Sequence, residues 1–274
     1  MAGLKPLLLA AALLLCTASK AYEWQLPLGF PEPQVPHDNP MSTAKVELGR
    51  LLFFDTRLSY NQTYSCATCH QPKLAFTDGL SKAIGSTGQI HTRNTMSLTN
   101  VAYNLSFSWA DNLHQNLEAQ ALVPLLNVEP IEMGVLNHEK EILKRYSDDA
   151  NFQSLVTQAF ELDAASLGKP FSLDHIQKAL ASFQRTLISG SSPYDDWLFN
   201  DNKDALTASA KKGMSLFFSK ALACGECHQG LNFSGDFSFN RNKRPEQNGR
   251  LAETAQIEAK PIFTNNGLYK SYQD

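Results

Sequence analysis

The pentapeptide Cys66-Ala67-Thr68-Cys69-His70 recurs 158 positions later as Cys224-Gly225-Glu226-Cys227-His228. Each copy has the form Cys-x-x-Cys-His and offers two thiols one helical turn apart, which suit thioether bonds to the two vinyl groups of haem. The adjacent imidazole is placed to ligate the haem iron. The two motifs therefore predict two covalently bound haem c groups. The predicted haem-binding residues are Cys66, Cys69 and His70 in the first motif and Cys224, Cys227 and His228 in the second.

Two other kinds of site also use Cys-x-x-Cys pairs. Zinc sites built from two such pairs usually separate them by roughly 15–20 residues, far fewer than the 158 positions found here. A redox dithiol is a single pair near a βαβ pattern, which would explain neither the second copy nor the two histidines. The spacing and the paired histidines favour haem over both alternatives.

Residues 1–21 have the pattern of a secretory signal peptide. Lys5 precedes an apolar run from Leu7 to Cys16, and small residues stand before the expected cleavage point after Ala21. The run is short for a membrane span. Cys16 would leave with the signal, so the mature chain would keep only the motif cysteines of the original five. Because c-type haem is attached outside the cytoplasm, we expect an exported periplasmic protein without a membrane span.

Composition and pattern predict a mainly α protein of two domains. A net charge of −3 gives no basic field for nucleic acid, and no convincing strand pattern occurs. Residues 44–54 before the first motif and 210–218 before the second share a small residue, a Gly and an aromatic pair in register. We expect two cytochrome c-like haem domains related by duplication. The predicted division is a domain over 22–168 and a second over 169–274.

Two segments between the motifs have distinct patterns. Apolar residues recur at three- and four-residue steps from Leu173 to Leu187, which predicts a helix that opens the second domain. The segment from Lys82 to Asn104 is rich in Ser, Thr and Asn and has little periodicity. We expect it to form a long ordered loop near the first haem, and loops of this kind are often functional.

Further motifs surround the first haem motif. They are Leu48-Gly49-Arg50, Leu52-Phe53-Phe54-Asp55, Arg57-Leu58-Ser59, Ala75-Phe76-Thr77-Asp78-Gly79, Arg93-Asn94, Ser97-Leu98 and Asn100-Val101-Ala102-Tyr103. With these motifs the chain strongly resembles the bacterial di-haem cytochrome c peroxidase superfamily over residues 39–233. The stretch 85–94 is more similar to the MauG-like branch, including the MauG-like enzyme of methanobactin gene clusters, than to ordinary peroxidases.

The resemblance bears on the open face of the first haem. Ordinary peroxidases carry a removable distal His soon after the first motif, and the matching position here is Ser86. His91 lies five residues further on. It is either a shifted iron ligand or a loop His hydrogen-bonded to backbone or propionate. An iron without a distal protein ligand would be open to peroxide.

The resemblance also implies the groups that act on peroxide. The segment from Gln120 to Gly134 is similar to the family segment that supplies a proton-moving group and a polar group that orients the substrate. General acid–base catalysis needs both functions at the reacting oxygens. We expect Glu132 to be the acid–base residue and Gln120 the orienting amide. Glu129 is the alternative to Glu132.

Two more residues match family positions. Trp109 matches the tryptophan that lies between the haems and carries an electron or hole. The usual Trp-Asp-Gly-Arg stands here as Trp109-Ala110-Asp111-Asn112, with an extra residue before Gln120, so a buried core Trp is the alternative. Asn94 matches a residue that contributes to an inter-domain Ca²⁺ site. One oxygen ligand is a fraction of the roughly six to eight that Ca²⁺ takes.

Three functions are consistent with the sequence. The MauG-like resemblance implies that hydrogen peroxide is used at the first haem to oxidise an aromatic residue of a secreted partner protein. The ordinary peroxidase alternative reduces hydrogen peroxide with electrons from a small donor protein. A non-catalytic di-haem electron-transfer cytochrome is the alternative from another class. Ferric spectra separate them, because an open iron gives a high-spin signal and two closed irons do not.

The second haem lacks an evident distal ligand. In the resembled family a Met or a Tyr from a segment well downstream of the second motif closes this iron. Here 46 residues follow His228. We expect a truncated, incomplete second domain whose gene continues past Asp274. The side chains available within the chain are Tyr269, Tyr272 and Met214.

Overall fold

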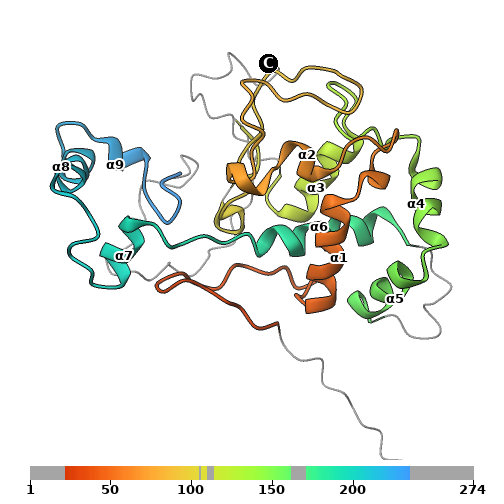
Figure 1. Cartoon of the computed structure of the whole chain (residues 1–274), viewed down its shortest axis with the longest axis horizontal. Coiled ribbons are helices and arrows are strands. Elements are labelled where there is room, and N and C mark those ends of the chain that lie inside the picture. The colour runs from red at the N-terminus through yellow and green to blue at the C-terminus, as the bar shows by residue number, and fades with distance from the viewer. Residues whose placement is uncertain (1–21, 105, 110–113, 162–170, 235–274) are drawn as a thin grey trace, which may run out of the picture.

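The computed structural model describes residues 22–104, 106–109, 114–161 and 171–234 (Figure 1). The predicted signal peptide and both C-terminal tyrosines lie outside these residues. In the described part the regular structure is helical and no strand forms, which confirms the prediction of a mainly α protein. None of the helices in these residues combines the length and apolar character needed to cross a membrane.

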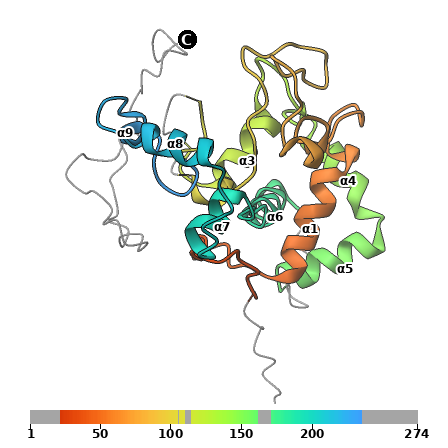
Figure 2. The same cartoon turned by 60° about the vertical axis from the view of Figure 1, so that its left-hand side comes forward.

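Nine α-helices and three 3-10 helices occur in the described residues. The α-helices are α1 Thr43–Phe54, α2 Cys66–Cys69, α3 Leu117–Leu126, α4 Glu139–Ser147, α5 Ala150–Ala159, α6 Leu173–Arg185, α7 Pro193–Phe199, α8 Ala208–Phe217 and α9 Cys224–Cys227. The 3-10 helices are η1 Thr56–Leu58, η2 Pro72–Leu74 and η3 Val101–Tyr103. Helices α1–α6 form a first unit, and α7–α9 gather at one end of the molecule as a second unit (Figures 1 and 2).

Helix α1 leads the chain into the first haem motif. Its N-cap is Ser42, whose hydroxyl accepts a hydrogen bond from the backbone N–H of Lys45 at 3.2 Å, a favoured arrangement. Leu48, Leu52 and Phe53 then form a buried face. Because that face is held in the core, the residues that follow α1 start from a fixed position at the haem motif.

Helix α6 is the main partner of α1 (Figure 2). A Cβ on Gly49 would lie 1.9 Å from the carbonyl oxygen of Ala179, so the two backbones meet at a distance that only glycine permits. Ile176 and Leu180 are buried in the same core as α1. The sequence predicted that this helix opens the second domain, but its apolar stripe packs on α1 and α3 in the core of the first unit. The predicted helix is confirmed, while the division at residue 169 stays a prediction.

Gly49→Ala is expected to destabilise the protein by about 1–3 kcal/mol, because the new methyl group must displace the backbone of α6. Thermal or urea unfolding measures the loss. The matched control is Gly213→Ala, since Gly213 occupies the equivalent place in α8 and its added Cβ would meet no atom within 4 Å. This control should be neutral or stabilising by up to about 1 kcal/mol, the helix-propensity gain of Ala over Gly. Equal losses in both variants would contradict the packing argument.

The N-terminal arm, residues 22–36, joins the two units. The buried Phe30 ring lies 5.9 Å from that of Tyr103 and 6.1 Å from that of Phe199 in α7. Tyr103 donates its hydroxyl to the carbonyl oxygen of Pro31 at 2.8 Å. The same Phe30 ring would lie 2.5 Å from a Cβ on Gly190. The arm therefore packs against the first unit and against the segment that leads to the second.

A buried polar network ties α3 to α6. Arg185 donates to both carboxylate oxygens of Glu118, at 2.8 and 2.9 Å. Asn39 donates to Glu118 at 2.6 Å and accepts from the Lys45 ammonium at 3.0 Å. These four side chains are all buried, and burial is the main reason that the pKa of Lys45 is lowered. A charge held this way is costly to leave unpaired.

Two candidate haem sites

The first motif forms helix α2, and its histidine is oriented by the backbone. His70 Nδ1 lies 2.9 Å from the carbonyl oxygen of Phe76. Because a carbonyl only accepts hydrogen bonds, Nδ1 carries the proton in the neutral imidazole, and the lone pair that can ligate a metal lies on Nε2. Burial lowers the pKa of His70, which favours the neutral imidazole that metal ligation requires. The Phe76 carbonyl is presented from a left-handed backbone with φ of 59°.

The pKa values of the two thiols differ from those of a redox dithiol. Burial raises the pKa of Cys66 to about 12, and burial with the neighbouring Asp78 charge raises that of Cys69 to about 11. Redox-active Cys-x-x-Cys pairs instead have a lowered pKa. Both cysteines are free thiols here.

A cavity of about 460 Å³ opens beside this motif. Cys66, Cys69 and His70 form part of its wall, and apolar side chains such as Phe53 and Leu180 form another part. The volume falls in the range of small-molecule and cofactor sites. Two thiols, a neutral imidazole with Nε2 available and an apolar wall fit a covalently held haem.

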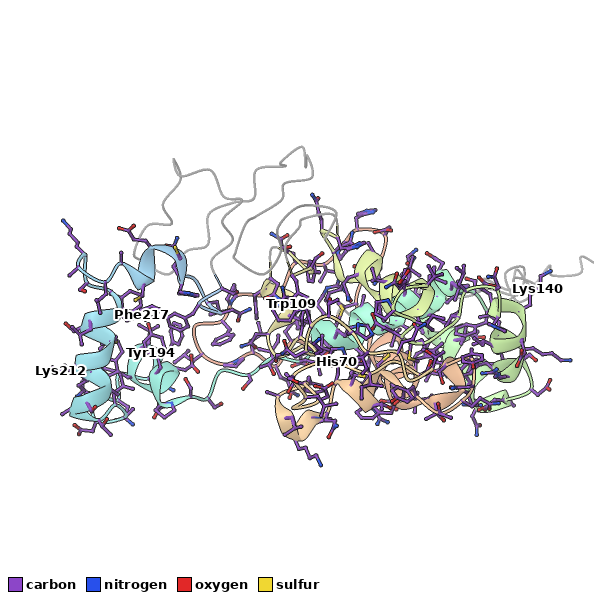
Figure 3. All side chains as sticks on the ribbon, turned by 90° about the horizontal axis from the view of Figure 1, so that it is seen from above. His70, Trp109, Lys140, Tyr194, Lys212 and Phe217 are labelled. Atoms are coloured by element: carbon purple, nitrogen blue, oxygen red, sulfur yellow. The ribbon has the colours of Figure 1, made fainter. Side chains whose placement is uncertain are left out.

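The cavity brings together the residues that the sequence singled out. Its lining includes Glu132, Gln120, Trp109, Asn94 and His91. Burial raises the pKa of Glu132 to about 7. Figure 3 shows Trp109 on the side of His70 that faces Tyr194 and Phe217 of the second unit. The alternative acid–base residue, Glu129, is exposed and does not line the cavity.

The loop from Lys82 to Asn104 forms one wall of this cavity, as the sequence predicted. The backbones of Ala83 and His91 are hydrogen-bonded across a narrow hairpin. Ser86 is buried, and its backbone N–H donates to the carbonyl oxygen of Glu132 at 2.8 Å. Ser86 therefore lies against the Glu132 backbone, and its match to a distal His stays a prediction. His91 lines the cavity, and both interpretations of it, a shifted iron ligand or a loop His hydrogen-bonded to backbone or propionate, stay predictions.

Some lining residues were not anticipated. Asn104, Phe107 and His114 contribute to the wall, although no motif in the sequence distinguishes them. For calcium, Asn94 donates through its side-chain amide to the Thr95 carbonyl at 3.3 Å. The described ranges hold no group of three or more His, Cys, Asp or Glu side chains suited to a metal. Calcium at Asn94 stays a prediction.

The second motif repeats the geometry of the first. His228 Nδ1 lies 3.1 Å from the carbonyl oxygen of Phe233, whose φ of 51° is again left-handed. The His228 ring lies 6.3 Å from that of Phe217, as the His70 ring lies 6.4 Å from that of Phe53. In both motifs the imidazole is therefore oriented by a hydrogen bond from Nδ1 to a backbone carbonyl that follows the motif.

A second cavity of about 490 Å³ adjoins this motif. Its wall contains His228 and is otherwise mostly apolar, with Met214, Phe217 and Phe233 among its members. Tyr194 of α7 also lines it and was not singled out by the sequence. Met214, one of the side chains available to the second iron, therefore lies in the wall of this cavity. An imidazole with an apolar wall fits a second haem, and the thiols of Cys224 and Cys227 precede His228 in α9 without lining this cavity.

Both sites define a helical protein with two c-type haem sites. The chain belongs to the di-haem cytochrome c peroxidase family, which it matches over residues 43–203. It is 38% identical over 210 residues to the methylamine utilization protein MauG of Methylorubrum extorquens, covering 76% of this chain and 56% of that protein. It is 37% identical over 205 residues to the cytochrome c peroxidase Ccp of Escherichia coli K12, covering 75% and 41%.

A solved structure gives the same result. The crystal structure of a MauG-like protein associated with microbial copper homeostasis superimposes with a TM-score of 0.73 and 38% sequence identity, covering 82% of this chain and 64% of that one. The chain thus spans 56% and 41% of the lengths of the two named relatives. The resemblance to this family predicted from the motifs is confirmed.

Proposed function

We propose that this chain belongs to a periplasmic di-haem oxidoreductase that uses hydrogen peroxide at the first haem to oxidise an aromatic residue of a partner protein. The observation that carries the proposal is the placing of Glu132, with its raised pKa of about 7, in the same cavity as His70. A carboxyl group that titrates near neutral pH suits proton transfer in both directions. Haem supplies the redox chemistry when bound.

The chain's own residues would divide the work as follows. The Glu132 carboxylate takes a proton from the bound peroxide oxygen and returns it to the departing oxygen. The Gln120 amide hydrogen-bonds to the peroxide and orients it. Trp109 offers an aromatic ring on the side toward the second unit, where an electron or hole would pass. Apolar walls keep bulk water from the proton transfer.

The partner protein is the part that rests on resemblance. The relative named MauG and the MauG-like structure support protein oxidation, whereas the Escherichia coli relative supports ordinary peroxide reduction with a small donor protein. The non-catalytic electron-transfer alternative requires that both irons be closed, with His91 the candidate ligand on the first cavity wall. The repeated motif geometry supports two haem units related by duplication.

The test uses the haem-loaded protein. A high-spin ferric signal together with rapid reaction with hydrogen peroxide supports the peroxide function, and two low-spin irons with no reaction would refute it. Mass spectrometry of any secreted protein found to be encoded beside this gene, after incubation with peroxide and enzyme, then looks for oxidised Trp or Tyr. Turnover only with a reduced small cytochrome, and no modified residue, would favour the peroxidase alternative.

Haem counting tests the architecture. Cys66→Ser combined with Cys69→Ser should lower the covalent haem content from two to one, because the first site loses both attachment thiols. A denaturing haemochrome assay measures this. Cys224→Ser combined with Cys227→Ser is the matched control and should also leave one haem, at the other site. A single haem in the unaltered protein would contradict the two-site architecture.

A further inference from the structure

The second haem motif is hydrogen-bonded directly to the first unit. Asn232 lies between His228 and Phe233, and its side-chain amide donates to two acceptors of the first unit. These are the carbonyl oxygen of Asn100 at 3.0 Å and the Oδ1 of Asn104 at 2.9 Å. All three asparagines are partly buried. Asn232 therefore fixes the loop of the second motif at a defined place on the first unit.

The acceptors are themselves held firmly. Asn100 has a left-handed backbone with φ of 59°, and its side chain donates to the Ser189 carbonyl at 2.8 Å while accepting from the Ser189 N–H at 2.7 Å. Its own N–H donates to the Leu187 carbonyl at 2.8 Å. Asn104 lines the first cavity. The two acceptors are thus part of the wall and frame of the first site.

These contacts form a continuous route between the two sites. At one end, His228 Nδ1 is hydrogen-bonded to the carbonyl of Phe233, which follows Asn232 in the chain. At the other end, the Asn232 amide reaches Asn104 on the wall of the first cavity. Covalent bonds and hydrogen bonds carry electronic coupling better than gaps between atoms do.

We propose that Asn232 is a positioning residue that docks the second haem motif on the first cavity and sets the rate of electron exchange between the two sites. The inference rests on the proposed function in that it takes both sites to hold haem. One electron leaves the second site and arrives at the first, with no bond made or broken. The Asn232 side chain acts alongside Trp109, which lines the first cavity.

The test compares Asn232→Leu with Asn202→Leu in the holoprotein. Asn202 is an exposed asparagine of the second unit whose amide donates to Asp196 at 2.9 Å, within that unit. After pulse reduction, absorbance follows the exchange of the electron between the haems. Asn232→Leu should slow this exchange roughly tenfold or more, because the loss of two ordinary hydrogen bonds shifts the docking equilibrium of the second motif by at least about that factor and the exchange takes place in the docked form. Asn202→Leu should leave it unchanged.

A second variant and a second measurement keep the test decisive. Asn232→Asp keeps the shape and removes the donor, so it should slow exchange as Asn232→Leu does. Hydrogen–deuterium exchange of the backbone amides from Asn100 to Asn104 should become faster in both variants, while the ferric spectrum of the first haem stays the same. Unchanged electron exchange in both variants, or equal slowing in Asn202→Leu, would overturn the proposal.

Failure of the Asn232 proposal can be distinguished from failure of the proposed peroxide function. Pulse reduction requires no peroxide, so electron exchange is measured even if the unaltered protein fails to react with peroxide. Conversely, Asn232→Leu should keep the first, Glu132-dependent phase of the peroxide reaction, because Asn232 donates to Asn100 and Asn104 and does not line the first cavity. Loss of that first phase in Asn232→Leu would count against a purely positioning role.

Discussion

Glu132→Gln is expected to retain both haems and to slow the reaction with hydrogen peroxide by roughly 10²–10⁴-fold, the usual cost of losing a general acid–base group. The amide keeps the size and the hydrogen-bonding shape of the carboxyl group but takes up no proton. Stopped-flow absorbance at the first haem measures the rate. Glu129→Gln is the matched control, because Glu129 is exposed and outside the cavity. The proton-transfer role would move to Glu129 if the control lost the rate and Glu132→Gln kept it.

The pH dependence gives this prediction a second readout. Burial raises the pKa of Glu132 to about 7, and the carboxylate is the form that takes the proton from peroxide. The rate should therefore rise as the pH increases through about 7 and level off above it. In Glu132→Gln this rise of the rate with pH should disappear. A rise of the rate centred near the ordinary glutamate pKa would show that the group acting as base is exposed to water.

Glu118→Leu is expected to lower the free energy of unfolding by about 3–5 kcal/mol, because it leaves the buried guanidinium of Arg185 without its carboxylate. Urea unfolding of the holoprotein measures the change. The control is Glu47→Leu, which removes an exposed pair with Arg50 at 2.6 Å, a contact of about 0–1 kcal/mol. Both pairs are short, but the Glu118 pair is buried and its carboxylate also accepts from Asn39, whereas the Glu47 pair is exposed on a single helix. Similar losses in the two variants would show that the network of Glu118 tolerates an unpaired charge.

The sequence predicted the features that neighbouring residues determine, namely the haem motifs and helix α6. A Cys-x-x-Cys-His motif fixes its own helix and the direction of its imidazole, and an apolar stripe at helical spacing from Leu173 predicted α6. The stripe does not say which surface it will meet, so the packing of α6 on Gly49 was visible only in three dimensions. For the same reason Asn232 carries no signal in the sequence, since its partners lie more than a hundred residues away.

The candidate site divides in the same way. Glu132, Gln120 and Trp109 were found because they stand in motifs that resemble a family, and the structure places all three on one cavity. Asn104 lies at the end of the loop from Lys82, and His114 lies in the segment before α3, and both line that cavity. Whether a loop residue lies in the cavity wall depends on how the whole chain folds, and a short sequence pattern does not predict that.

The proximal hydrogen bonds at His70 and His228 set how strongly each imidazole pushes electron density toward a bound metal. Both acceptors are neutral backbone carbonyls, which draw less on the ring proton than a carboxylate would. Neither ligand is therefore driven toward imidazolate character by its hydrogen-bond acceptor. A difference in reactivity between the two sites would then come from their surroundings, because among the described residues the half-buried Glu132 carboxyl group lines the first cavity and no carboxyl group lines the second.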